Sequence, residues 1–264
     1  MSKFIERLQK VGVSVVAPLG FGATRSQEKN PALALVHLSG LKQIGDLNSY
    51  VSGSGNGSYI VSANKVVKSQ LSSIKKAMKE GVWGVWLETA TQASLEVLKK
   101  EGGDFFLFSR LDIPAEILSG DQLGKVMVIE TGQSEDMIRS IEDLPIDGVL
   151  LVGLEKSSPM TVGDILKVGF VRDQISKPML LLRKTRLSKG ELEILQDMGV
   201  QGIVVDANEL DVVEVSGMQE DIERLPPRKS ARDAGSLLVP RIGGGASNLR
   251  GVEEEDDDDD DDII

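Results

Sequence analysis

Polar and charged side chains stand at or just beyond the ends of several short apolar runs in this chain of 264 residues. A carboxylate or an imidazole can take up a proton, oxygen ligands suit hard divalent cations, and guanidinium or ammonium groups bind anions. The chemistry therefore depends on whether the fold brings these side chains together. They are His37, Ser39, Glu88, Ser109, Arg110, Glu130, Glu155, Arg183, Lys184 and Asp206.

Eight apolar runs, each followed by a helix-like stretch, recur at a spacing of 21 to 31 residues. Runs that are apolar on both faces are typical of parallel strands covered by helices, so this rhythm predicts an α/β fold, a (β/α)8 TIM barrel. Barrel enzymes carry their sites at the C-terminal ends of the strands, where these polar side chains stand. The runs are Leu33–Leu38, Ser58–Ala63, Val82–Glu88, Asp104–Phe108, Lys125–Thr131, Asp147–Val152, Pro178–Arg183 and Gly202–Asp206.

An N-terminal addition precedes the repeat. It is predicted to hold a helix and then the strand-like run Val13–Leu19, and to close the bottom of the barrel. A second way of counting makes Val13–Leu19 the first barrel strand, in which case Ser58–Ala63 is irregular. The predicted segments are the addition at 1–30, the barrel at 31–225, a C-terminal extension at 226–245 and an acidic tail at 246–264.

Composition excludes several classes of chemistry. The chain has no cysteine, which excludes disulfides and thiolate catalysis, and one histidine, which excludes a multi-histidine metal site. No stretch approaches about 18 uninterrupted apolar residues, so no membrane span is expected. The N-terminus mixes charges early and lacks the apolar centre of a signal peptide, which predicts a cytoplasmic protein.

The net charge of −11 belongs mainly to the tail. Glu253–Asp262 contains ten of the 41 acidic residues, which leaves 31 acids against 30 bases in the remainder. A nearly neutral body with an acidic tail predicts that nucleic acid is not a ligand. Two interpretations of residues 246–264 stay open: a disordered, self-repelling extension, or a docking peptide for a basic protein partner.

One segment resembles a known family. Ile129–Gly132 (IETG) is followed by a helical stretch and then by Leu144–Gly153 (LPIDGVLLVG). A strand ending in Glu-Thr, a short helix, a Pro-hydrophobic-Asp-Gly step and a second strand are typical of the HpcH/HpaI-type aldolase and citrate lyase family of pyruvate/phosphoenolpyruvate barrels. The resemblance is clearest over residues 126–155.

This resemblance implies a metal site. In the family a Glu and an Asp hold Mg²⁺ or Mn²⁺, which binds a 2-oxo acid and stabilises its enolate. Glu130 matches the Glu, and Glu155 stands where the family has its Asp. The family's catalytic histidine after the second strand is absent, since Asn64 stands there, and Glu88-Thr89 ends the third strand where the family has an arginine. The resemblance also implies a homo-oligomer.

The remaining candidate residues keep two interpretations each. If the face of Leu33, Leu35 and His37 is interior, His37 lies near the barrel mouth and could act as a base; otherwise it is a hydrogen-bonded structural histidine. Arg183 and Lys184, with Arg186, could bind an anion or form a cationic surface turn. Glu130 could equally cap a helix or pair with a nearby cation.

Two functions from different classes follow. The first is a divalent-metal-dependent lyase of the aldolase type acting on a small 2-oxo acid or its thioester. Glu130 and Glu155 hold the metal; Arg110, Arg183 or Lys184 binds the substrate carboxylate; and His37 or a metal-bound water is the base. The second is a non-catalytic barrel, a scaffold or assembly subunit whose tail docks a basic partner. A third, a cofactor-dependent oxidoreductase or a sugar-phosphate enzyme, lacks a Gly-rich phosphate signature.

Overall fold

The computed structural model describes residues 2–12, 30–40, 57–64, 67–78 and 81–226. The strand-like run Val13–Leu19, the predicted extension from residue 227 onward and the acidic tail lie outside these ranges. Within them, no helix is long and apolar enough to cross a membrane.

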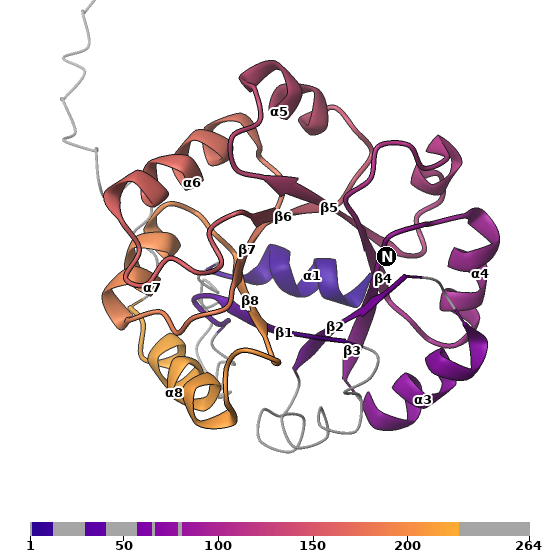
Figure 1. The fold of residues 1–264 in the computed structure, drawn as a ribbon, viewed down its shortest axis with the longest axis horizontal. Helices are drawn as coiled ribbons and strands as arrows, with labels where there is room; N and C mark the ends of the chain where they lie inside the picture. Colours follow the sequence, from indigo (N-terminus) through magenta and orange to yellow (C-terminus); the bar gives the residue numbers. More distant parts are fainter. Residues whose placement is uncertain (1, 13–29, 41–56, 65–66, 79–80, 227–264) are drawn as a thin grey trace, which may run out of the picture. The chain divides into compact units, whose positions relative to one another are not determined.

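Eight parallel strands close into a barrel in the order of the sequence. They are β1 (Ala34–Gly40), β2 (Ser58–Ala63), β3 (Val82–Leu87), β4 (Phe105–Phe108), β5 (Gly124–Glu130), β6 (Gly148–Val152), β7 (Met179–Arg183) and β8 (Gly202–Asp206). The described helices are α1 (Lys3–Lys10), α3 (Lys68–Met78), α4 (Gln92–Lys100), α5 (Glu135–Glu142), α6 (Val162–Gln174), α7 (Lys189–Asp197) and α8 (Val212–Glu223). All but α1 surround the strands (Figure 1), so the predicted (β/α)8 TIM barrel is confirmed.

The count that begins at Leu33–Leu38 is confirmed. β1 pairs with β2 on one side and with β8 on the other, so the ring closes at this strand. β2 is regular over the whole of Ser58–Ala63 and pairs with both of its neighbours. The second way of counting is therefore wrong, because the barrel is complete without Val13–Leu19.

Each strand is apolar on both faces because each face meets a different hydrophobic layer. Alternate side chains of a strand point to opposite sides. The inward set, here called the lumen cluster, includes Val36, Leu38, Ile60, Leu107, Val126, Leu150, Leu182 and Val204. The outward set, here called the outer cluster, lies between strands and helices and includes Tyr59, Val61, Met127, Val149, Leu181 and Ile203.

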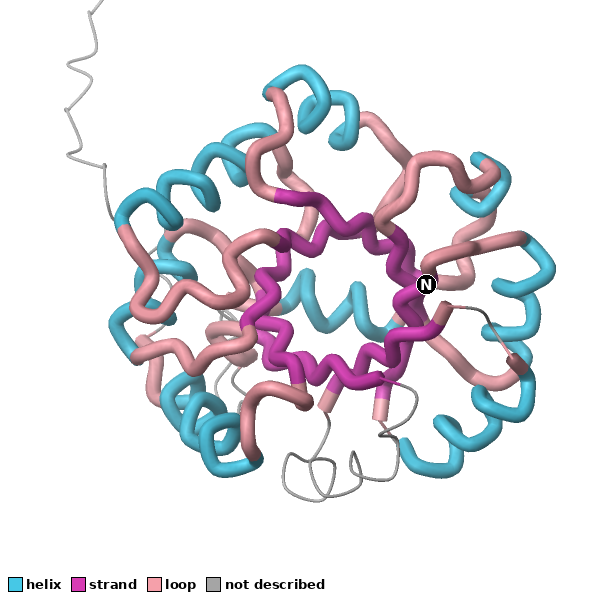
Figure 2. Tube along the Cα trace, in the orientation of Figure 1, coloured by secondary structure: helices cyan, strands magenta, loops and turns pink. Residues whose placement is uncertain are grey.

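The helix α1 closes the N-terminal end of the barrel. Phe4, Ile5 and Leu8 belong to the lumen cluster, and the ring of Phe4 stacks on Phe105 with centroids 4.0 Å apart. Asp104 fixes the start of the helix: its Oδ2 accepts from the backbone N–H of Phe4 at 2.8 Å. Figure 2 shows α1 crossing the ring of strands.

Between β4 and β5 the sequence rhythm predicts a helix, and the structure has only a 3-10 turn, η2 (Ala115–Leu118). Pro114 precedes this turn and Gly120, with a positive φ of 83°, follows it. The Nζ of Lys125 donates to the carbonyls of Leu118 at 3.1 Å and Gly120 at 2.8 Å, so a buried lysine satisfies the end of the turn.

Candidate functional site

The mouth of the barrel, at the C-terminal ends of the strands, contains a hollow of about 410 Å³. Its apolar lining comes from strand residues: Leu38, Trp86, Val128, Val152 and Leu182. Its polar lining comes from strand ends and the loops behind them: Ser109, Glu130, Gln133, Glu155, Lys184 and Asp206. A neighbouring hollow shares Leu38, Trp86, Ser109 and Asp206 and adds, among others, Ser62, Glu88 and Asn208.

Lys184 and Asp206 form an ion pair inside the mouth, with Nζ and Oδ2 3.8 Å apart. The side chains are 30% and 10% exposed. Asn208 fixes the carboxylate, because Oδ1 of Asp206 accepts from its backbone N–H at 3.0 Å and its side-chain amide at 2.7 Å. Within the described lining, Lys184 thus pairs with a carboxylate that two hydrogen bonds from Asn208 hold in place.

Glu130 and Glu155 line the same hollow from neighbouring strand ends. Glu130 is the last residue of β5 and is exposed. Oε1 of Glu155 accepts from the backbone N–H of Gly153 at 2.7 Å, and the carbonyl of Glu155 accepts from the N–H of Lys184 at 2.9 Å. Three of the six predicted site residues, Glu130, Glu155 and Lys184, therefore meet at one hollow.

His37 lies on the other face of β1. Its neighbours Val36 and Leu38 belong to the lumen cluster, so by alternation its own side chain points to the outer layer. There it stacks on Tyr59 with ring centroids 5.3 Å apart, and it is 2% exposed. Burial lowers the pKa of His37 from 6.5 to about 4. The expectation of an interior His37 at the mouth is thus wrong, because the lumen face of β1 is the one that carries Val36 and Leu38.

Arg183 also points away from the mouth. It is fully buried, and its guanidinium donates to the carbonyls of Leu154 and Ser157 and to Oγ1 of Thr185 at 2.8 Å. Burial lowers the pKa of this guanidinium from its usual value. Arg183 and Lys184 are successive residues, so their side chains point to opposite faces and only Lys184 lines the hollow. Arg183 instead holds the loop after β6.

Arg110 lies outside the lining as well. Its guanidinium makes a two-pronged ion pair with Asp112 on the exposed loop after β4. The hydrogen bond that Arg110 donates to Asp112 raises the pKa of Arg110, and the same bond lowers the pKa of Asp112. In the structure its nearest acid is thus a neighbour in the loop, while Ser109 is the residue of this loop that reaches the hollow.

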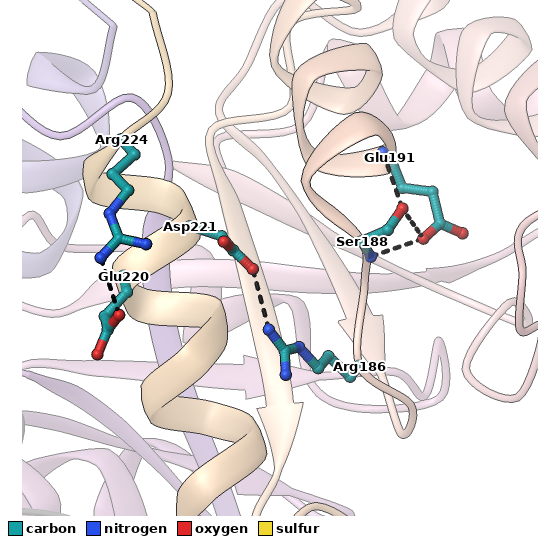
Figure 3. A network of polar contacts seen from close by, with 6 residues as sticks. All are labelled: Arg186, Ser188, Glu191, Glu220, Asp221 and Arg224. Atoms are coloured by element: carbon teal, nitrogen blue, oxygen red, sulfur yellow. Dashed lines mark hydrogen bonds and ion pairs between the residues drawn. The ribbon is translucent and has the colours of Figure 1, made fainter.

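The turn after β7 continues into the start of α7, which is shown in Figure 3. Arg186 pairs with Asp221 of α8 at 3.1 Å. Oε2 of Glu191 accepts from the backbone N–H of Ser188 at 2.7 Å. A carboxylate of the chain itself therefore lies at the N-terminal end of α7. These contacts fit the interpretation of a paired, cationic surface turn for Arg186 alone, since Arg183 is buried and Lys184 lines the hollow.

Sequence reasoning missed Trp86 and Gln133, which line the hollow. Trp86 stands two residues before Glu88 on the same face of β3, so the alternation of the strand was the signal that could have found it. Gln133 follows β5 in a turn with Gly132, whose φ is 99°, and no spacing in the sequence reveals where that turn points.

The lining of the two hollows carries an excess of negative charge. Among the described residues that line them, four are carboxylates, Glu88, Glu130, Glu155 and Asp206, and one, Lys184, is a cation. No group of three or more His, Asp or Glu side chains with metal-binding geometry occurs in the described part of the chain. From the described residues, a divalent ion at the mouth would thus have two carboxylates at most in its first coordination sphere.

No protein-family model matches the chain, and no curated protein matches it by sequence. Among solved structures, mutants of the tryptophan synthase alpha-subunit from the hyperthermophile Pyrococcus furiosus align with TM-scores of 0.55 and 0.56 at 12% identity, over 73% of this chain and 97% of theirs. The YdjI aldolase from Escherichia coli K12 aligns with a TM-score of 0.49 at 9% identity, over 73% of this chain and 88% of its own.

At such low identity the likeness to the tryptophan synthase alpha-subunit shows the fold alone. It agrees with the TIM barrel formed by β1–β8. The resemblance to the HpcH/HpaI-type family stays a prediction, since no family model bears on it.

Proposed function

We propose that this barrel is a lyase of the aldolase type that acts on a small 2-oxo acid or its thioester and uses Mg²⁺ or Mn²⁺. One observation carries the proposal. Four charged side chains from four consecutive strand ends, Glu130, Glu155, Lys184 and Asp206, line a single hollow with an apolar floor. Convergent charges at the C-terminal face of a barrel are the arrangement that catalysis on this fold requires.

The donor set fits a hard divalent cation. Mg²⁺ keeps several waters and is commonly held by one or two carboxylates, which is what Glu130 and the second carboxylate oxygen of Glu155 offer. The excess of acids in the mouth favours a cation and disfavours a free anion. When bound, such a metal would supply Lewis-acid stabilisation of negative charge on a substrate oxygen.

The chain's own residues would bind the substrate, accept its proton and exclude water. Lys184 is the one cation of the described lining and would bind the substrate carboxylate, its ammonium held near Asp206. Asp206, fixed by Asn208, is the base we assign in place of His37, because it faces the hollow and His37 does not. Trp86 and its apolar neighbours on the floor would exclude water from the reacting side of the substrate.

Calorimetric titration of the purified chain with Mg²⁺ and Mn²⁺, with and without pyruvate or oxaloacetate, tests the proposal. We expect saturable metal binding that the 2-oxo acid strengthens and that Glu130→Gln abolishes. Glu96→Gln, which removes an exposed carboxylate on α4, is the matched control and should bind as the parent does. Absence of metal binding in a natively folded parent would contradict the proposal.

One observation favours the non-catalytic alternative. Arg183 is occupied in the outer layer and Arg110 pairs with Asp112, so the anion-binding set expected from the sequence reduces to Lys184 in the described lining. A non-catalytic barrel would show no binding of Mg²⁺ or Mn²⁺ in the calorimetric titration. It would also lose a basic partner when residues 246–264, outside the described part, are removed.

A further inference from the structure

The two hollows at the mouth have different linings. The first hollow, which is lined by Glu130, Glu155 and Lys184, carries its charges on the ends of β5 to β7 and the loops behind them. The neighbouring hollow, here called the second hollow, has a volume of about 410 Å³ and takes most of its lining from β1 to β4 and the residues just beyond them. Figure 1 shows these four strands along one half of the ring.

Small residues keep the second hollow open. Ser62 follows Ile60 on the lumen face of β2, because alternate residues of a strand share a face. In register it pairs with Gly40 on one side and with Trp86 on the other. A glycine and a serine at this level leave space that larger side chains fill deeper in the lumen. The resulting volume is typical of a site for a small molecule.

The polar lining of the second hollow suits hydroxyl groups. The hydroxyls of Ser62 and Ser109 can each donate and accept a hydrogen bond, whereas the carboxylates of Glu88 and Asp206 accept only. A ligand hydroxyl also donates and accepts, so it can pair with any of these groups. A ligand that carries several hydroxyls therefore fits this lining better than an apolar ligand does.

The charge of the second hollow disfavours anions. Among its described lining residues, Glu88 and Asp206 are acids and none is a cation. Arg110 is close enough to interact with Glu88, but its guanidinium is paired with Asp112 and is outside the described lining. A phosphate or carboxylate group placed here would meet two like charges, which is a common means of rejecting a ligand.

We propose that the second hollow binds an uncharged, hydroxylated aldehyde, which the lyase joins to the 2-oxo acid in the first hollow. The reaction in this inference rests on the proposed function, but the binding does not. The two hollows share Leu38, Trp86, Ser109 and Asp206, so ligands in them would be adjacent. Asp206 would lie beside both ligands.

This placement allows a balanced carbon–carbon bond formation. Asp206 takes a proton from the carbon next to the carbonyl of the 2-oxo acid. That carbon then forms a bond to the aldehyde carbon, and the electron pair of the aldehyde's carbon–oxygen double bond moves to its oxygen. The oxygen takes the proton back from Asp206. The product is a longer, hydroxylated 2-oxo acid, and cleavage is the reverse of these steps.

Saturation-transfer NMR of the full chain, with neither metal nor 2-oxo acid present, tests the binding alone. The probes share one carbon skeleton: glyceraldehyde, propanal, which lacks the hydroxyls, and glyceraldehyde 3-phosphate, which adds negative charge. We expect glyceraldehyde to bind at least about tenfold more tightly than either of the others. The lining offers partners for its hydroxyls, and the two carboxylates repel the phosphate.

A substitution in β2 locates this binding. Ser62→Leu fills the space at the mouth with an apolar side chain and should weaken glyceraldehyde binding by about tenfold or more. Ser73→Leu makes the same change at an exposed serine of α3, and this control should bind as the parent does. Circular dichroism verifies that both variants are folded.

A charge reversal tests the rejection of anions. Glu88→Arg places a guanidinium in the lining of the second hollow and should strengthen binding of glyceraldehyde 3-phosphate by about tenfold or more. Glu96→Arg makes the same change at an exposed position of α4 and should leave that affinity as in the parent. This pair of variants tests the inference even if Ser62→Leu does not fold.

Exchange of the methyl protons of pyruvate in deuterated water with Mg²⁺, without any aldehyde, reports the proposed reaction separately. Exchange without preferential binding of glyceraldehyde would overturn the subsite and leave the reaction. Glyceraldehyde binding that Ser62→Leu weakens, without exchange, would support the subsite and contradict the proposed function. Equal binding of the three probes would overturn the inference. So would an affinity for glyceraldehyde 3-phosphate that Glu88→Arg leaves unchanged.

Discussion

Acidification should destabilise this protein through its single histidine. Burial lowers the pKa of His37 from 6.5 to about 4 in the folded state, whereas the unfolded chain keeps the ordinary value. Above pH 6.5 the imidazole is neutral in both states and contributes nothing to the pH dependence. Between 6.5 and about 4 the unfolded state takes up a proton that the folded state refuses, so the free energy of unfolding falls.

The magnitude follows from the difference between the two pKa values. One pKa unit corresponds to about 1.4 kcal/mol, so the shift of His37 from 6.5 to about 4 costs about 3 kcal/mol once the pH has reached the lower value. The side chain is 2% exposed, so solvent screens this penalty little. For a domain of ordinary stability that is a large fraction of the total.

Urea unfolding of the parent and of His37→Phe at several pH values isolates this contribution. Phenylalanine retains an aromatic ring against Tyr59 and cannot titrate. Any contact that the neutral imidazole makes shifts the free energy of unfolding by the same amount at every pH. The titration of His37 instead changes how steeply that free energy varies with pH. We expect the difference in free energy of unfolding between the two proteins to change by about 3 kcal/mol between pH 7 and pH 4.

Because there is one histidine, its NMR signal is also unambiguous, and it should titrate far below 6.5 in the folded protein. Parallel pH profiles for parent and variant, or a histidine that titrates near its ordinary pKa, would refute the burial argument.

Two other perturbations test the packing of the barrel. Gly84→Ala should lower the free energy of unfolding by about 2 kcal/mol or more, because a Cβ there would lie 2.5 Å from the ring and carbonyl of Phe105. Gly190→Ala, where a Cβ would meet nothing within 4 Å, should raise it by about 0.5 kcal/mol; equal effects in urea unfolding would contradict the packing. Asp104→Ala should cost about 2 kcal/mol and speed amide exchange in α1, because Asp104 accepts three hydrogen bonds from the start of that helix. Exchange in α1 that matches an Asp121→Ala control would contradict that role.

The architecture could be predicted from the sequence because it depends on a repeated pattern. The runs Ser58–Ala63 and Gly202–Asp206 coincide with β2 and β8, since each has an apolar centre and is bounded by turn residues. The segment between β4 and β5 escaped the same reasoning. The spacing of the apolar runs predicts that an element covers these strands, but it does not predict which kind. Pro114 before the segment and the hydrogen bonds of Lys125 at its end favour a 3-10 turn.

The site was harder to predict because the sequence does not say which face of a strand is interior. Each face of β1 carries apolar residues, Leu35 on one and Val36 and Leu38 on the other, so the alternation divides its residues into two sets without orienting them. The register resolves this: Leu38 pairs with Asp206, and both line the mouth, which leaves His37 outside. The same rule separates Arg183 from Lys184. Glu130 and Lys184 were found because each stands at a strand end with the inward parity.

The residue turned away from the mouth still bears on what the mouth contains. The guanidinium of Arg183 donates to the carbonyls of Leu154 and Ser157, which stand on either side of Glu155 in the chain. The backbone of Lys184 in turn donates to the carbonyl of Glu155. One buried cation and its neighbour therefore fix the backbone that presents a carboxylate to the hollow. Because a buried guanidinium is costly to leave unpaired, the loop after β6 is held in place by the same burial that removes Arg183 from the site.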